Sequence, residues 1–265
     1  MSITSTVVDG ADSEFIQAAD VLRPFVGCFW VITAQRGATI RVVPDGTTSI
    51  SIELRPSSAS GWFLRGPLIK PQELRFRSAA TLIGIRLRPG VAYLVSRIAA
   101  DAMLGRRFRL SGSAFRALTR GNPLARTPTG NIEVLQQFLI DRLANANVHP
   151  IVSNAMHAIE QRHGCASVAG IAAECGVSPR HLSRLMRLWV GYGPKCLARV
   201  VRFQEALKQM ENMPGRSGAT LASETGYFDQ AHLTLDLTRM AGATPRHLAS
   251  RSVADFYKTR CDVAL

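Results

Sequence analysis

A basic stretch without acidic residues carries the clearest chemistry in this 265-residue chain. Residues 178 to 204 contain no Asp or Glu, and their cations fall at helical spacing. These cations are Arg180, Arg184, Arg187, Lys195, Arg199 and Arg202, with Ser183 between the first two. A guanidinium group binds phosphate and can clasp the O6 and N7 atoms of guanine. Because a solvated helix face normally mixes both signs of charge, the stretch predicts a nucleic-acid contact rather than a plain surface.

Capping residues and apolar spacing predict two helices that position these cations. Ser167 suits a helix start because its hydroxyl accepts an unpaired backbone N–H, and Gly176 suits a helix end because glycine tolerates positive φ. A second start follows at Ser178-Pro179. The stripe expected to be buried on this second helix is Leu182, Leu185, Met186 and Trp189. The pattern predicts a helix-turn-helix over residues 167–190, whose second helix can enter a major groove.

The same pattern occurs again 51 residues later. The first copy has Ser178, His181, Leu182, Gly191, Pro194 and Leu197, and the second has Asp229, His232, Leu233, Gly242, Pro245 and Leu248. A second helix-turn-helix is therefore predicted over 217–241, and a connecting helix over 194–212 would be roughly 28 Å long at about 1.5 Å per residue. Since major-groove segments recur about every 34 Å along one face of a duplex, one protomer can reach two of them.

The repeat resembles the DNA-binding domain of the AraC/XylS family of bacterial transcription regulators. The first motif reads A-x-x-x-G-V-S-P-R-H-L-S-R-L-M-R-x-x-x-G-x-x-P, and the second reads A-x-x-x-G-Y-F-D-Q-A-H-L-T-x-x-x-x-x-x-x-G-A-T-P-R-H-L. The segment R-F-Q-E-A-L lies between them. The resemblance implies an all-α domain of about seven helices, in which one long helix holds two helix-turn-helix units rigidly apart.

The base-facing positions implied by the resemblance differ between the two units. They fall on Arg180, Ser183 and Arg184 in the first, and on Gln230, Ala231, Thr234 and Leu235 in the second. Members of the family commonly have Arg where this chain has Leu235, and Phe where it has Leu237. Residues 217–250 also carry a net charge of −1. We therefore expect the first unit to supply most of the affinity and specificity. The expected DNA contacts are Arg180, Ser183, Arg184, Arg187, Lys195, Arg199, Gln230, Ala231, Thr234, Arg239 and Arg246.

Other residues of this region are expected to serve the fold. The predicted core comprises Leu182, Leu185, Trp189, Leu221, Phe228 and Leu233. The recurrence of His181 and His232 favours packing or bonding near a helix start over a metal site or pH switch. Tyr227 is expected to pack its ring and offer its hydroxyl locally.

The N-terminal part predicts a strand-rich, sheet- or barrel-like domain with trailing helices, so the chain as a whole is of the α+β class. Period-two alternation marks strands with one buried face; the alternating apolar residues are Ile50, Ile52 and Leu54, Leu74 and Phe76, and Ile85 and Leu87. Turns are expected at Pro44-Asp45-Gly46 and Gly66-Pro67. One helix is expected to bury Val91, Leu94, Val95 and Ile98, and another to follow Asn131 after a loop from Thr119 to Gly130.

This part resembles, more weakly, an N-terminal domain found in some members of the same family. The matching pieces are P-F-V-x-x-F-W at 24–30, P-D-G at 44–46, G-P at 66–67 and G-I-R-L-R-P-G at 84–90. The resemblance implies a domain that senses an effector or mediates self-association. Trp30, Arg41, Trp62 and Arg86 either line a pocket for an anionic or aromatic ligand or are core aromatics and surface arginines. The second interpretation is favoured.

Length, charge and cysteine usage agree with a two-domain regulator, with a sensor or oligomerisation domain over 1–148 and a DNA-binding domain over 149–265. The net charge is +13, of which the two parts carry +8 and +5, so global basicity alone does not locate the DNA site. The five cysteines show no zinc-ligand spacing and are expected to be reduced thiols, with a redox pair of Cys165 and Cys175 as a minor alternative. No signal peptide or long apolar stretch occurs, which predicts a cytoplasmic location away from membranes.

These observations predict a sequence-specific DNA-binding transcription regulator that acts near promoters. Its expected partners are double-stranded DNA, RNA polymerase, a small-molecule effector and a second copy of the chain in a homodimer. No cofactor, metal or catalytic residue is predicted, because the chain lacks catalytic motifs such as H-E-x-x-H and G-x-S-x-G. Two alternatives stay open: an architectural DNA binder without strong sequence preference, and a DNA-binding enzyme.

Overall fold

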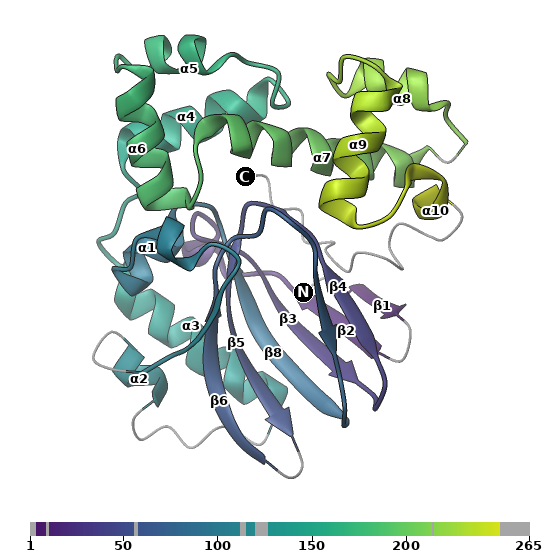
Figure 1. The fold of residues 1–265 in the computed structure, drawn as a ribbon. Coiled ribbons are helices and arrows are strands. Elements are labelled where there is room, and N and C mark those ends of the chain that lie inside the picture. The colour runs from purple at the N-terminus through teal and green to yellow at the C-terminus, as the bar shows by residue number, and fades with distance from the viewer. Residues whose placement is uncertain are drawn as a thin grey trace.

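The computed structural model describes residues 4–8, 11–55, 58–111, 115–119, 127–213 and 215–249. A strand-rich N-terminal half lies beneath a helical C-terminal half (Figure 1). This arrangement confirms the predicted α+β class. Pro214, Cys261 and most of the loop predicted between Thr119 and Gly130 lie outside the described residues.

The N-terminal half contains an antiparallel seven-stranded sheet with the order β1-β2-β3-β8-β5-β6-β9 and a separate antiparallel pair, β4-β7. The strands of the larger sheet are β1 (Thr4–Val8), β2 (Ala11–Ile16), β3 (Val26–Ala34), β5 (Thr48–Arg55), β6 (Ser58–Arg65), β8 (Ala80–Leu87) and β9 (Arg107–Arg109). The pair consists of β4 (Thr39–Val42) and β7 (Gln72–Arg75). The segment Pro44-Asp45-Gly46 therefore connects strands of two different sheets rather than forming a hairpin.

Period-two alternation divides the larger sheet into two faces of different chemistry. On β8, Ile83 and Ile85 are fully buried in a core cluster that also contains residues of α1 (Val91–Ser96) and α3 (Pro128–Leu143). The alternate residues Gly84 and Arg86 lie on the opposite face, toward β4 and β7. The predicted strands are thus confirmed, but their polar face borders a space inside the protein instead of open solvent.

Two helix boundaries in this half differ from the predictions. Helix α1 ends at Ser96 because Arg97 adopts the left-handed conformation, so Ile98 lies beyond the helix and is 39% exposed. Helix α3 begins at Pro128, earlier than predicted, because the Thr127 hydroxyl accepts the Gly130 backbone N–H at 3.2 Å. A short helix, α2 (Arg116–Thr119), and two 3-10 turns, Asp20–Leu22 and Ala100–Met103, complete the half.

Seven helices follow in the described part of the C-terminal half. They are α4 (Pro150–Gln161), α5 (Val168–Glu174), α6 (Pro179–Val190), α7 (Pro194–Asn212), α8 (Gly218–Glu224), α9 (Gln230–Ala241) and α10 (Pro245–Ala249). Helix α7 runs across the top of the molecule, with α5 and α6 at one end and α8 and α9 at the other (Figure 1). Its Phe203 is fully buried in a core that reaches Leu182 of α6 and Leu233 of α9.

Candidate nucleic-acid interface

The two helix-turn-helix units use the same local devices to place their second helices. The Ser178 hydroxyl accepts the His181 backbone N–H at 3.2 Å, and the Asp229 carboxylate accepts the His232 backbone N–H at 2.7 Å. These bonds satisfy N–H groups that have no partner within the helix. Both second helices end at a glycine in the left-handed region, with φ of 99° at Gly191 and 69° at Gly242.

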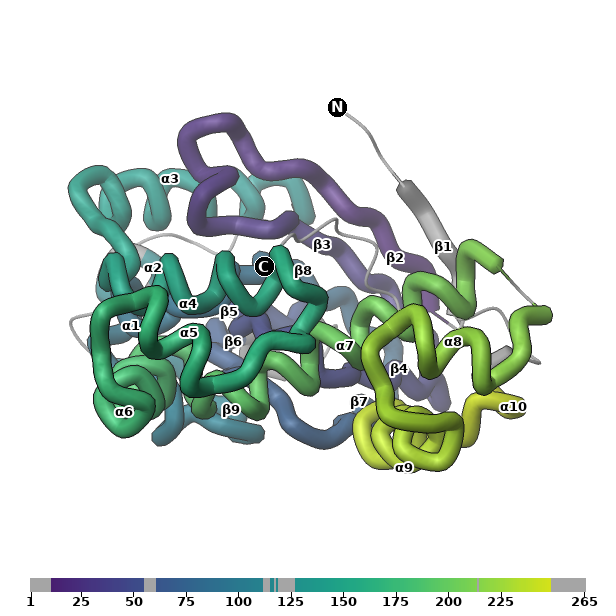
Figure 2. The backbone as a smooth tube through the Cα atoms, turned by 90° about the horizontal axis from the view of Figure 1, so that it is seen from above, coloured from purple at the N-terminus to yellow at the C-terminus, as the bar shows by residue number. Residues whose placement is uncertain are grey.

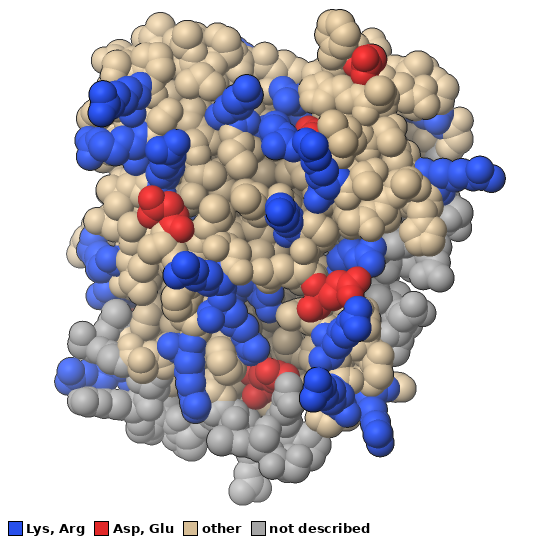
Figure 3. All heavy atoms as spheres, in the orientation of Figure 1, with Lys and Arg blue, Asp and Glu red and all other residues tan. Residues whose placement is uncertain are grey.

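Helix α6 presents its cations to solvent while it buries its apolar stripe. Arg180, Arg184 and Arg187 are exposed, and Ser183 is half-buried. The side chains of Leu182, Leu185, Met186 and Val190 are buried beneath them. Figure 3 shows Lys and Arg side chains gathered over α6 at the upper left of the molecule. An exposed basic ridge on a rigidly packed helix suits a major groove with anionic walls.

Helix α9 presents a different surface in a matching place. Gln230, Ala231 and Leu235 are exposed, and Thr234 is half-buried. The exposed cations of this unit, Arg239 and Arg246, lie at the end of α9 and on α10. Figure 2, which looks down from above, shows α6 and α9 nearly end-on, at opposite ends of α7 and on the same side of it. The two helices therefore lie on one side of the helical half.

Arg199 of α7 has a partner inside the protein. Its guanidinium donates to the Asp236 carboxylate, at 2.8 Å through Nη2 and 3.3 Å through Nε. Asp236 has only 3% of its side chain exposed, and the hydrogen bonds to it raise the pKa of Arg199. The pair fastens α9 to α7, whereas Lys195, earlier on α7, is exposed.

The acidic residues of the second unit are largely engaged. Glu224 forms an ion pair with Arg216, and Asp236 is buried against Arg199. In the first unit, Glu174 is held in the same manner by Arg162, through two hydrogen bonds of 2.8 and 3.0 Å. The net charge of −1 counted over 217–250 therefore overstates how acidic the surface near α9 is.

Phe228 is the clear error among the predicted core residues, since it is 93% exposed. Its neighbour Tyr227 takes the buried place and is only 4% exposed, with the His232 ring edge-on at 5.2 Å. Phe228 directly precedes the helix-capping Asp229 and faces outward there. The Tyr227 ring packs as predicted, but its hydroxyl has no hydrogen-bond partner among the described residues. Burial, followed by the Asp236 charge, raises the pKa of Tyr227.

The two recurring histidines have local contacts. His181 Nδ1 lies 3.4 Å from Arg184 Nη2, and His232 Nε2 lies 4.0 Å from the Asp236 carboxylate. Among the described residues, no group of three or more metal-ligating side chains is found together. The four cysteines within the described ranges are free thiols, and no helix there is long and apolar enough to cross a membrane.

Family models match both halves of the chain. Residues 171–251 match the model of a helix-turn-helix domain, which is of the AraC type. This match covers the tandem units whose geometry is described above. The C-terminal half therefore contains a DNA-binding domain of the AraC/XylS type. The chain is accordingly a DNA-binding transcription regulator. Residues 14–109 match a domain of unknown function, DUF6597, so the N-terminal half is matched by a family model of its own.

Several solved structures are similar to this chain at low identity. The C-terminal domain of AraT, a response regulator from Geobacillus stearothermophilus, has 20% identity and a TM-score of 0.38, covering 42% of this chain and 93% of that one. ToxT from Vibrio cholerae has 10% identity and a TM-score of 0.47, covering 84% and 97%. An AraC-type regulator from Chromobacterium violaceum has 22% identity and a TM-score of 0.36, covering 38% and 90%. No curated protein sequence matches significantly.

The sequence left two interpretations open for Trp30, Arg41, Trp62 and Arg86, and the structure gives three of these residues one place and the fourth another. Trp30, Arg41 and Arg86 line a cavity between the two sheets, whereas Trp62 is buried in the core beneath the larger sheet. The cavity also has residues that sequence reasoning did not single out, including Asp45, Glu53, Arg65 and Arg107. Period-two alternation was the available signal, because it places Ser49, Ser51 and Glu53 on one face of β5.

Proposed function

We propose that this regulator binds DNA sequence-specifically, with α6 and α9 in successive major-groove segments of one duplex. The observation that carries the proposal is the exposure of Arg180 and Arg184 on a packed helix, on the same side of α7 as α9. Within the part of the chain that the structure describes, the N-terminal half leaves this ridge exposed. It meets α6 at the opposite end, where the Trp189 ring lies 4.8 Å from the Tyr93 ring.

The proposed DNA contacts are of two kinds, those with base edges and those with phosphates. Arg180, Ser183 and Arg184 read base edges from α6, while Arg187 and Lys195 bind phosphates. The second unit contributes Gln230, Ala231, Thr234, Arg239 and Arg246 through amide, apolar and phosphate contacts. Arg199 changes role in this proposal: it orients α9 through Asp236 and does not contact DNA.

The N-terminal half, over 1–148, controls the DNA-binding half, over 149–265, by sensing an effector or by self-association. The two halves share buried contacts, because Val43 belongs to the helical core and Gln204 Nε2 of α7 donates to the Pro44 carbonyl at 2.5 Å. A change in the strand-rich half can therefore alter how α7 holds its two units. The regulator acts in the bacterial cytoplasm, where it contacts RNA polymerase at the promoter.

Selection of duplexes from a random library, followed by affinity measurement, tests the proposal. The selected duplex should bind at least tenfold more tightly than a scrambled one at the same salt concentration, since specific binding exceeds non-specific binding by about 10³-fold or more. Equal affinities would favour the architectural alternative. The Arg184→Ala variant should lose this preference, whereas Arg77→Ala, at an exposed position in the strand-rich half, should keep it.

A further inference from the structure

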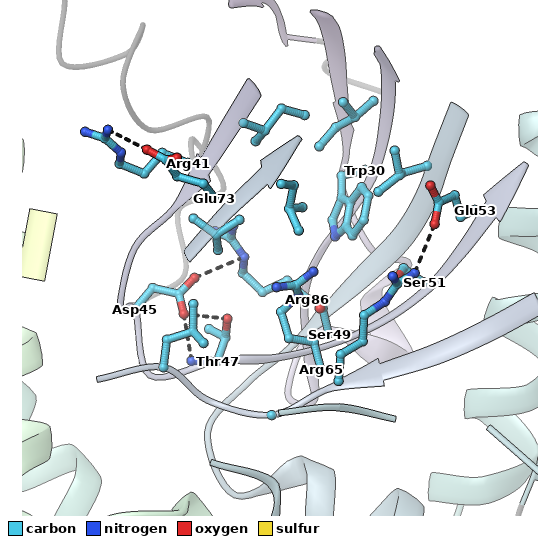
Figure 4. Close-up of a pocket in the computed structure, with 18 of the residues that line it drawn as sticks. Trp30, Arg41, Asp45, Thr47, Ser49, Ser51, Glu53, Arg65, Glu73 and Arg86 are labelled. Carbon is cyan, nitrogen blue, oxygen red and sulfur yellow. Dashed lines mark hydrogen bonds and ion pairs between the residues drawn. The ribbon is translucent and has the colours of Figure 1, made fainter. Parts of the chain in front are cut away.

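A cavity of about 240 Å³ lies between the larger sheet and the β4-β7 pair. Trp30, Arg86 and Arg65 come from the larger sheet, and Ile40 and Leu74 from the pair. Figure 4 shows the Arg86 side chain reaching from β8 toward Asp45, with Trp30, Ser49 and Arg65 around it. This volume is small compared with cavities that hold drug-sized ligands, which measure about 300–1,000 Å³.

The sequence builds this cavity at a defined position of the sheet. A Cβ atom at Gly84 would lie 2.4 Å from Cζ2 of Trp30, so only glycine at this position lets the indole ring lie over β8. Ser49 and Ser51 of β5 keep the adjoining floor small and polar. Sites that hold small molecules typically combine apolar walls with a few convergent polar groups, and this cavity has both.

The ion pair at the centre of the cavity, between Arg86 and Asp45, is mostly shielded from water. Arg86 Nε lies 3.4 Å from the Asp45 carboxylate, with 11% and 15% of the two side chains exposed. Glu53 pairs with Arg107 at 3.2 Å. Burial, and then the neighbouring Arg107 charge, lower the pKa of Arg65. The arginines thus outnumber the acids, and an additional anion would relieve repulsion between Arg65 and Arg107.

We propose that this cavity binds a small monocarboxylic acid, whose carboxylate pairs with Arg86 and whose compact apolar body lies against Trp30. Three acidic residues, Asp45, Glu53 and Glu73, border the same space and would repel a group with two negative charges, such as a phosphate monoester. A single carboxylate matches the guanidinium fork with less repulsion. The apolar walls, which include Ile32, Ile40 and Leu82, exclude a strongly hydrated ligand.

The carboxylate that the ligand displaces belongs to the connection between the cavity and the DNA-binding half. Asp45 Oδ1 accepts the Thr47 backbone N–H at 2.9 Å and the Thr47 hydroxyl at 2.7 Å, while Oδ2 faces Arg86. The preceding residue, Pro44, accepts the hydrogen bond from Gln204 of α7. Val43 is buried in the helical core. One short segment, 43–47, therefore touches the ligand site at one end and the helix that spaces the two units at the other.

Segment 43–47 provides a physical route by which an effector can control DNA binding. This inference rests on the proposed DNA-binding function. A ligand carboxylate competes with Asp45 for Arg86 and weakens the bond that holds segment 43–47 in place. The segment then no longer fixes α7 through Gln204. Because coupling between two binding sites is reciprocal, duplex binding must change the affinity for the acid by the same factor as the acid changes the affinity for the duplex.

Calorimetric titration of the full chain with benzoate and hexanoate tests the site directly. One or both acids should bind at one molecule per chain, and the tighter of the two shows whether the apolar body is aromatic or aliphatic. Benzyl alcohol and 1-hexanol have similar bodies without the charge and should bind at least about tenfold more weakly, the usual effect of a lost charge-assisted hydrogen bond. Failure of both acids to bind, or equal binding of the alcohols, would overturn the proposal.

Variants locate the site within the chain. Arg86→Gln should weaken binding of the tighter acid at least about tenfold, while Arg77→Gln, an exposed arginine outside the cavity, should leave it unchanged. Asp45→Asn should strengthen binding, because it removes the competing carboxylate. If Arg86→Gln alone fails to fold, the Asp45→Asn/Arg86→Gln double variant removes both charges of the pair and should fold without binding the acid. Unchanged acid affinity in this double variant would refute the assignment.

A final measurement separates this inference from the proposed function. Duplex affinity is measured with and without saturating acid, in the original chain and in Gln204→Ala. The acid should change duplex affinity in the original chain, and Gln204→Ala should remove the change while acid binding persists. If the acid binds but does not change duplex affinity, the coupling is refuted and the DNA-binding function is unaffected. If the chain binds the acid but binds no duplex, the DNA-binding function is refuted and the acid site is unaffected.

Discussion

The two helix-turn-helix units have the same backbone structure and share an apolar core with α7, but the second is also held to α7 by an ion pair with Arg199. Their capping residues and terminal glycines coincide at an offset of 51 residues. At the same offset, however, buried Leu185 of the first unit corresponds to buried Asp236 of the second. At this position the first unit packs an apolar side chain, whereas the second adds an ion pair with Arg199 to an apolar core that includes Leu233. Two units with the same local backbone structure can therefore be oriented on α7 by residues that are not repeated.

The outer faces of α6 and α9 carry different types of side chain at matching positions of the repeat. The exposed cations Arg180, Arg184 and Arg187 correspond to Ala231, Leu235 and Thr238. Leucine and alanine can contact a thymine methyl group but cannot clasp guanine. The structure therefore supports an unequal pair through the types of side chain presented, and less through net charge, since the acids of the second unit are engaged.

The largest expected effect is on the free energy of unfolding, and it concerns the ion pair between Arg199 and Asp236. Arg199→Ala should lower the free energy of unfolding by about 3 kcal/mol, because it leaves the Asp236 carboxylate buried without its partner. Denaturant unfolding measures this loss, and exposed Arg187→Ala should change the value by less than about 0.5 kcal/mol. The Arg199→Met/Asp236→Leu double variant, which copies the apolar chemistry of the first unit, should recover most of the loss. Recovery no better than in Arg199→Ala would contradict the comparison.

The next effect concerns DNA affinity. Arg184→Ala should weaken binding to the selected duplex by about 1–3 kcal/mol, since it removes the proposed bidentate contact with guanine. Leu235→Ala, at the matching position of α9, should cost less than about 1 kcal/mol. Fluorescence anisotropy at one salt concentration measures both variants. Similar losses would show that the two units contribute equally.

A smaller effect should appear in the salt dependence of binding. Arg187→Gln and Lys195→Gln should each reduce the slope of log K against log salt by about 1, because each removes one phosphate contact. Thr238→Ala, at the position that matches Arg187, should leave the slope unchanged. A slope that stays the same in all three variants would mean that neither cation contacts phosphate.

The smallest effect is expected at Phe228. Because this side chain is 93% exposed, Phe228→Ala should change the free energy of unfolding by less than about 0.5 kcal/mol. The adjacent Tyr227→Ala should cost several kcal/mol, since it empties a buried site. Thermal or denaturant unfolding compares the two, and a large loss in Phe228→Ala would restore the original prediction of a core residue.

The amino-acid sequence alone was sufficient for features that depend on a few neighbouring residues. Ser178 caps its helix as predicted, Asp229 does the same at the matching position of the repeat, and α7 spans Pro194–Asn212, because capping and helical periodicity act within one or two turns. The burial of Ile50 and Ile52 also followed from alternation along one strand. Side-chain direction next to a turn was less predictable, as Phe228 shows.

Only the tertiary structure decided which distant residues meet. Arg199 and Asp236 are 37 positions apart, and their pairing depends on how α9 packs against α7. Arg86 and Asp45 are 41 positions apart, and they face each other because β5, which follows the 43–47 segment, pairs with β8 and places Ser49 opposite Arg86. Local propensity contains no information about such pairs, since their energy arises only after the chain has folded and water has been excluded from between them.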